Sequence, residues 1–287
     1  MCILALPVRS VRNTRIFVGT NTEGDRQLTV YEMAVELVAR RQAANSTESP
    51  GNAMILPVPA GAPEQIDLID MTEAKDFFDG LETCFQPMTL GLKSRSRGMS
   101  NGFLEVHQVG SYNVSIANTY DELDLINPAV FTLSADAKQV LGSQYSRLNG
   151  PKFCFVVAQL RESGKFHPLA FSHPIAEDGK LFIPTKHEHG LKIPGVSEES
   201  LRGRAVWDHH IFHQSTATYD EQPRSKDRTE RVGNQNRYGQ IKNTLAHWAE
   251  KVPALAPYFD ISEDCRLART EFKGVLKNID LRLPVAA

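Results

Sequence analysis

The feature that most constrains this fold is a succession of strand-like apolar runs with no helix-like segment between most of them. The runs lie at residues 152–160, 166–172, 180–184 and 205–212. Strands in this order pair more readily as antiparallel neighbours than as βαβ units, because a parallel pair needs a long crossover connection. Three other segments have the apolar spacing of helices, at 72–85, 134–148 and 237–252. The order predicts an α+β fold, mainly an antiparallel sheet with several helices packed on it.

The remaining segments complete this expectation. Apolar runs at 2–9 and 14–20, around the polar residues 10–13, predict a β-hairpin. A strand at 278–285 is expected to close a sheet. The polar segments 42–52 and 219–236 are predicted to be mobile insertions, the second because it is charged and nearly free of aliphatic side chains. Since no internal repeat or linker is visible, we expect a single domain over residues 1–287.

Charge and hydropathy argue against several classes of function. Lys and Arg number 32 against 34 Asp and Glu, a balance that disfavours bulk binding to nucleic acid or anionic membranes. No stretch approaches the ~20 apolar residues of a spanning helix, and residues 1–8 lack the pattern of a secretory signal. The cysteines form no CxxC pair, as expected for reduced thiols (Cys2, Cys84, Cys154 and Cys265). These features predict a cytoplasmic protein without a membrane span.

Several runs resemble a bacterial domain family of unknown function. They are RQLTVYEMAV, AMILPVP, VGSYNVSIA, KFCFVVAQLR and FHPLAF, and they cover residues 16–184 in the same order of elements. In that family a similar return strand ends in a Leu-Pro-Val-Pro-like turn, and a Gly-x-Tyr-x-Val strand precedes a helix. The resemblance implies continuity of fold and no particular activity. Members of the family usually carry export signals, and this chain departs from them there.

Histidines are concentrated in one segment of the chain. Seven of the nine lie between positions 167 and 213: His167, His173, His187, His189, His209, His210 and His213. His187 and His189 are two residues apart, so on a strand they would share one face. The same parity places Asp208 with His210, and His209 with His213, if residues 205–212 are a strand. This segment is the strongest candidate for a functional site.

Imidazole and carboxylate groups are the ligands that transition metals accept, in sets of three or four. A hairpin between the two histidine runs would bring such groups together around a Zn²⁺ or Fe²⁺ ion. His187, His189, Asp208 and His209 are the first candidates, followed by His210 and His213, with Asp208 also a candidate catalytic group. His167 and His173 are the weakest candidates. The alternative is structural, with histidines serving as polar partners of core aromatic residues.

The start of the chain is similar to that of N-terminal-nucleophile hydrolases. In those enzymes removal of the first Met exposes a nucleophile whose own amine acts as base. The resemblance implies Cys2 as nucleophile, Arg12 or Arg15 as a substrate anchor and Asn21 as a polar helper. The Asn-Arg-Asp or Arg-x-x-Asp signature of such families is absent from the first 25 residues, which carry the resemblance. A buried structural cysteine is the alternative.

A third hypothesis is a non-enzymatic interaction protein that uses the segments 42–52 and 219–236. No phosphate-binding loop or HExxH helix is present, which disfavours several large enzyme classes. The ligand or substrate is expected to be a small molecule of unknown identity. The sequence therefore favours metal binding and leaves Cys2 chemistry and protein interaction open.

Overall fold

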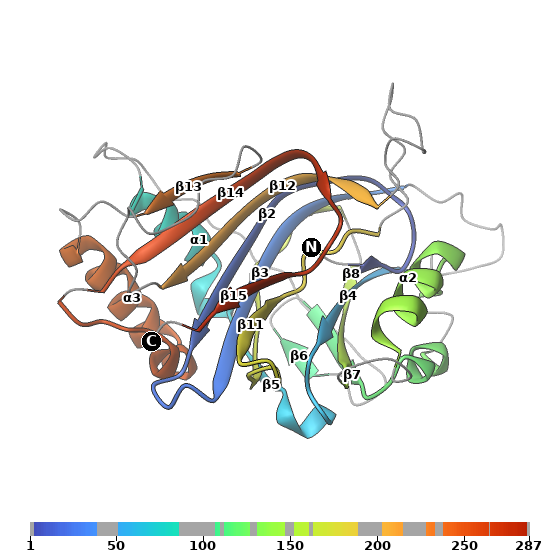
Figure 1. Cartoon of the computed structure of the whole chain (residues 1–287), viewed down its shortest axis with the longest axis horizontal. Helices are drawn as coiled ribbons and strands as arrows, with labels where there is room; N and C mark the ends of the chain where they lie inside the picture. Colours follow the sequence, from blue (N-terminus) through green and yellow to red (C-terminus); the bar gives the residue numbers. More distant parts are fainter. Residues whose placement is uncertain are drawn as a thin grey trace.

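The computed structural model describes residues 3–38, 51–85, 107–109, 112–126, 131–146, 152–160, 163–188, 203–214, 228–232, 238–263 and 265–285. In this part of the chain two mainly antiparallel sheets enclose a common core, and helices pack around them (Figure 1). The α+β fold predicted from the order of apolar runs is confirmed. None of the helices in the described residues has both the length and the apolar character needed to cross a bilayer.

The larger sheet forms the broad arch in Figure 1, and eight strands of it lie in the described residues. Its order is β13-β14-β12-β2-β3-β10-β5, and β9 also pairs with β3. Its strand pairs are antiparallel except β12 and β2, which run parallel. The strands are β2 (Val8–Thr20), β3 (Arg26–Leu37), β5 (Asp67–Ile69), β9 (Gly164–Lys165), β10 (Leu169–Pro174), β12 (Arg204–Gln214), β13 (Arg228–Val232) and β14 (Leu267–Lys277).

The smaller sheet has the order β1-β4-β8-β7-β6, with every described pair antiparallel. Its strands are β1 (Ile3–Leu4), β4 (Asn52–Val58), β6 (His107–Val109), β7 (Tyr112–Ala117) and β8 (Cys154–Leu160). A separate antiparallel pair is formed by β11 (Lys180–Ile183) and β15 (Leu281–Pro284).

Three α-helices cover the sheets in the described residues. α1 (Phe77–Thr83) and α3 (Tyr238–Lys251) pack on the outer face of the larger sheet, and α2 (Ala135–Tyr145) packs on the core between the sheets. The Ser134 hydroxyl caps α2 by accepting a hydrogen bond from the Ala137 N–H at 3.1 Å. The 3-10 helices within the described ranges are η1 (Pro63–Gln65), η2 (Thr72–Ala74), η3 (Asp121–Leu125) and η7 (Pro253–Tyr258).

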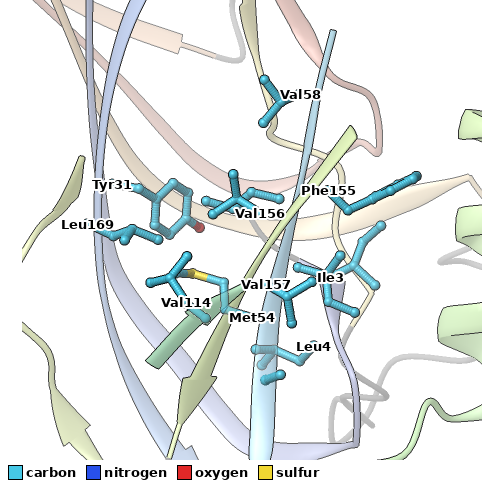
Figure 2. Packing of buried hydrophobic residues seen from close by; sticks show 14 of the residues in the cluster. Ile3, Leu4, Tyr31, Met54, Val58, Val114, Phe155, Val156, Val157 and Leu169 are labelled. Atoms are coloured by element: carbon cyan, nitrogen blue, oxygen red, sulfur yellow. The ribbon is translucent and has the colours of Figure 1, made fainter. Parts of the chain in front are cut away.

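Alternate residues of the larger sheet enter two different cores, as the period of a strand requires. On β12, Ile211 faces the smaller sheet and Phe212 faces α1 and α3. Figure 2 shows the core between the sheets, where Tyr31 of the larger sheet approaches Val156 of the smaller one. Burying each such side chain stabilises the fold by about 1.5–3 kcal/mol. Both faces of β12 are therefore covered, and its residues divide between two environments.

The prediction of an N-terminal hairpin is wrong. Residues 8–20 form one strand, β2, and the expected turn lies inside it. Asn13 has a φ of 51°, and the register against β3 shifts between Arg12 and Arg15, so the polar residues form a bulge. The preceding short strand β1 pairs with β4 in the other sheet.

The strands of the structure differ from the predictions in three further places. The segment 219–236, expected to be a mobile insertion, contains β13, which pairs with β14. The rest of that segment and residues 42–50 lie outside the described residues. The strand expected at 278–285 is the shorter β15, whose described partner is β11. The sequence did not predict β14, which pairs along the whole length of β12.

Candidate functional site

Two histidines from separate segments meet beside a tryptophan on the inner face of β12. The ring centres of His187 and His209 are 4.8 Å apart, and the Trp207 ring lies 5.3 Å from His187 and 5.0 Å from His209. All three side chains are buried. Trp207 also packs against Phe272 of β14, at 5.3 Å. We call His187, Trp207 and His209 the inner cluster.

The two histidines reach this position by different routes. His209 lies in mid-strand, between Phe272 of β14 and Thr14 of β2. His187 follows the end of β11, and the predicted hairpin between the two histidine runs is wrong, because β11 pairs with β15 while β12 pairs with β14 and β2. The residue after His187, Glu188, forms a parallel bridge with Ile3. The inner cluster therefore joins a strand centre to an irregular segment.

Asp208 and His210 lie on the opposite, outer face of β12. The Asp208 carboxylate accepts a hydrogen bond from the backbone N–H of Asn13 at 3.0 Å. His210 Nδ1 donates to the Glu82 carboxylate of α1 at 2.7 Å, and its Nε2 is 3.9 Å from Glu271. Because the strand separates these groups from the inner cluster, the structure divides the predicted ligand set between two faces.

Glu82 connects α1 to the sheet through His210 and Arg269. Its second carboxylate oxygen accepts a hydrogen bond from Arg269 of β14. Burial on its own would raise the pKa of Glu82, but the hydrogen bond from His210 and the charge of Arg269 outweigh burial and lower it. Arg269 also lies over the Phe85 ring, with its guanidinium carbon 5.1 Å from the ring centre. The outer histidine thus serves an ion-pair network that docks a helix.

A second ion-pair network lies on the same face, one strand further along the sheet. Arg15, the register partner of His210, pairs with Glu32 of β3 and with Asp79 of α1, and it lies over the Phe78 ring. Lys165 adds a contact with Asp79 at 3.2 Å. Burial raises the pKa of Glu32 and is only partly offset by Arg15. Asp79 and Glu82, three residues apart, thus place both carboxylates of α1 over cations of the sheet.

The residues suggested to assist Cys2 have structural partners. Arg15 belongs to the buried network, and Arg12 pairs with Glu36 at 3.5 Å on the surface. The Asn21 side chain accepts hydrogen bonds from the backbone N–H groups of Asp25 and Arg26, so it holds the turn between β2 and β3. Cys2 lies outside the described residues.

The remaining predicted ligands lie apart from the inner cluster or outside the described residues. His213 shares the parity of His209 but is four residues further on, a distance of about 13 Å along a strand. His189 lies outside the described residues. No group of three or more His, Cys, Asp or Glu side chains within the described ranges could hold a metal ion. The structure therefore brings together His187 and His209 from the predicted set.

His167 and His173 have the structural role that was the alternative reading of these histidines. Each precedes a proline, and each ring Nδ1 donates to that proline's carbonyl oxygen, at 2.8 Å for His167 and 2.7 Å for His173. Burial lowers the pKa of His167 and lowers that of His173 to about 4. A neutral imidazole held this way has a hydrogen-bond partner for its Nδ1–H inside the fold.

Sequence reasoning missed the partners of His210. Glu82 and Arg269 come from α1 and β14, which are distant from the histidine segment in the chain. The available signal was the spacing of Asp79 and Glu82, three residues apart on a predicted helix, which places both on one side. Their target could not be identified, because β14 was not predicted.

Comparisons with known proteins bear on the fold alone. No protein-family model matches the chain, and no curated protein matches it. Among solved structures, the crystal structure of baculovirus P35 is similar, with a TM-score of 0.50 and 10% sequence identity over 100% of both chains. This likeness supports a shared overall fold. It bears on neither of the two families that the sequence resembles.

Proposed function

We propose that the protein binds a divalent transition metal, Zn²⁺ or Fe²⁺, through His187 and His209. The observation that carries the proposal is the approach of these two imidazoles from separate segments, with ring centres 4.8 Å apart. Imidazole nitrogens bind zinc at about 2.0–2.1 Å, so two rings on one tetrahedral ion have centres about 5 Å apart. The spacing of the pair fits this requirement.

The surroundings of the pair favour a metal ion that the imidazoles bind directly, without a shell of water around it. Both imidazoles are buried, and the indole of Trp207 covers them. A ligand shell shielded from water strengthens electrostatic interactions with a cation. β12 is held on both sides by β14 and β2, which fixes His209 in position. Such preorganisation reduces the cost of assembling a site.

A stable metal site needs more ligands than two. Within the described residues no third His, Cys, Asp or Glu completes the group. His189 follows His187 by two residues and remains the sequence-based candidate for a third ligand. Asp208 and His210 are excluded from this proposal by their position on the outer face.

Elemental analysis of the untagged protein tests the proposal. We expect bound zinc or iron in the wild type, its loss in His187→Ala and in His209→Gln, and partial loss in His189→Ala. His173→Gln is the matched control, because His173 is a buried histidine with its own backbone partner. Metal-free wild-type protein that also takes up no added Zn²⁺ would contradict the proposal, and circular dichroism of each variant separates metal loss from unfolding.

A second candidate is N-terminal-nucleophile chemistry at Cys2, with an amide as substrate. The observation that favours it is the position of β1, which is buried between β4 and Glu188 beside the inner cluster. The Leu4 N–H donates to the Glu188 carbonyl at 2.8 Å, next in sequence to His187. Cys2 directly precedes Ile3, the first residue of this strand, in the sequence. Intact mass with Met1 retained, or a Cys2 thiol unreactive toward an acyl donor, would exclude this reading.

A further inference from the structure

We infer that Asn278, with Asp280, is a positioning group that sets where the His187 imidazole lies relative to His209. The two side chains belong to the connection between β14 and β15 and hold the backbone of residues 185–187. The consequence for metal affinity rests on the proposed function, whereas the consequence for ring position does not.

Asn278 makes a two-bond contact with His187. The backbone N–H of His187 donates to Asn278 Oδ1 at 2.6 Å, and Asn278 Nδ2 donates to the His187 carbonyl at 2.9 Å. A side-chain amide has one acceptor and two donors, so it can bond a backbone N–H and a carbonyl as a neighbouring strand would. His187 lies beyond the end of β11, and Asn278 supplies the bonds that strand pairing gives within a sheet.

Asp280 fixes the two preceding residues. One carboxylate oxygen accepts the backbone N–H groups of Thr185 and Lys186, both at 2.9 Å, and the other accepts the Tyr145 hydroxyl of α2. Burial raises the pKa of Asp280, although the hydrogen bonds from Tyr145 and Lys186 oppose this. Residues 185–187 are therefore bonded in succession to one short segment.

The side chain of Thr185 bonds in turn to the backbone of the segment that carries Asn278 and Asp280. Its hydroxyl donates to the Ile279 carbonyl at 2.9 Å and accepts the Leu281 N–H at 3.0 Å. The next pair along, Ile183 with Leu281, belongs to the regular pairing of β11 with β15. The segment after β11 thus continues the sheet through side chains in place of backbone pairing.

The same connection is tied to the strand that carries His209. Asn278 directly follows β14, its N–H donates to the Gly203 carbonyl at 2.9 Å, and β14 pairs with β12 through Phe272 and His209. The β12–β14 pair therefore positions both histidines of the inner cluster: β12 carries His209, and Asn278 at the end of β14 holds His187. Removing the amide of Asn278 releases His187 and leaves His209 in place.

Zinc affinity and ring position test this inference together. In Asn278→Ala we expect Zn²⁺ affinity, measured by competition with a chromophoric chelator, to fall about 10- to 100-fold. Asn278→Asp keeps an acceptor for the His187 N–H, so its loss should be smaller. Asn113→Ala is the matched control, because Asn113 bonds Gln159 in the smaller sheet. In the metal-free protein, ring resonances of His187 and the Trp207 indole should move in Asn278→Ala and stay fixed in the control.

The outcomes separate the two proposals. Wild-type protein that takes up no Zn²⁺ refutes metal binding, while moved ring resonances still support the positioning role. Unmoved His187 and Trp207 resonances in both Asn278 variants overturn the positioning role. Moved resonances with unchanged Zn²⁺ affinity overturn its link to the metal. Should Asn278→Ala not fold, Asn278→Asp provides the same measurements.

Discussion

His209 and His210 are neighbours in sequence but occupy opposite faces of β12. His209 packs against the rings of His187 and Trp207, whereas His210 donates to the Glu82 carboxylate at 2.7 Å. The outer histidine has a charged partner that explains its presence through helix docking. The inner pair has an arrangement that suits a shared ligand. A cluster of histidines in sequence can therefore contain two unrelated roles, divided by the alternation of a strand.

The largest expected effect concerns the buried ion pair of the outer face. Glu32→Ala leaves Arg15 in a buried position without its main partner, so we expect a loss of about 3–5 kcal/mol in the free energy of unfolding. Urea denaturation measures it. Arg9→Ala is the matched control, because Arg9 pairs with Glu36 on the surface and such pairs contribute about 0–1 kcal/mol. Equal effects would show that the outer network does not anchor the fold.

Removing the outer imidazole should cost less. His210→Ala deletes a hydrogen bond to a charged, partly buried partner, and we expect about 1–2 kcal/mol of destabilisation in urea. Metal content should be unchanged, in contrast to His209→Gln. Loss of metal in His210→Ala would place the outer face in the site and remove the distinction between the faces.

Acid titration should detect the carboxylates of the outer network. The folded-state pKa of Glu82 is lowered, so its stabilising effect is present above the ordinary value of 4.5 and is lost as pH falls through the folded value. Glu32 has a raised pKa and acts in the opposite direction, because the folded state takes up its proton first. Glu82→Gln should reduce the slope of stability against pH below 4.5 by at most about 1.4 kcal/mol per pH unit. An unchanged slope relative to the exposed control Glu64→Gln would contradict this reading.

The smallest effect is expected at Asp208. Among the described residues its carboxylate accepts one hydrogen bond, from the Asn13 N–H at the β2 bulge, so Asp208→Ala should cost about 0.5–1 kcal/mol in thermal or urea unfolding. Metal content should remain that of the wild type. A metal-free Asp208→Ala protein would restore Asp208 as a ligand and refute the division between the faces.

Local patterns predicted much of the fold but little of its long-range pairing. Runs such as those of β4 and β8 were recognised because nearly every residue is apolar, as in a strand covered on both faces. β14 was missed because Arg269 and Glu271 interrupt its apolar pattern, and they do so because they serve the ion-pair network under α1. Asn13 resembled a turn because a bulge and a turn favour the same residue types.

The candidate site, like the fold, has features that a local pattern predicts and features that depend on long-range contacts. The parity of residues 208–213 follows from the strand period and could be read from the sequence. His187 and His209 were both named as candidate ligands, but the way they meet could not be predicted, because His187 lies in an irregular segment whose position depends on Asn278 and Asp280, both distant in sequence. Hydrogen bonds between such segments leave no local pattern.

The most direct test of the division between the two faces is a Zn²⁺ titration followed through histidine ring nitrogens by NMR. Coordination changes the resonance of the ligating nitrogen strongly and leaves other imidazoles near their starting positions. Saturable changes at His187 and His209, with His210 unchanged, are the predicted result. A titration that shifts His210 in their place, or that shifts none of the three, would contradict the account.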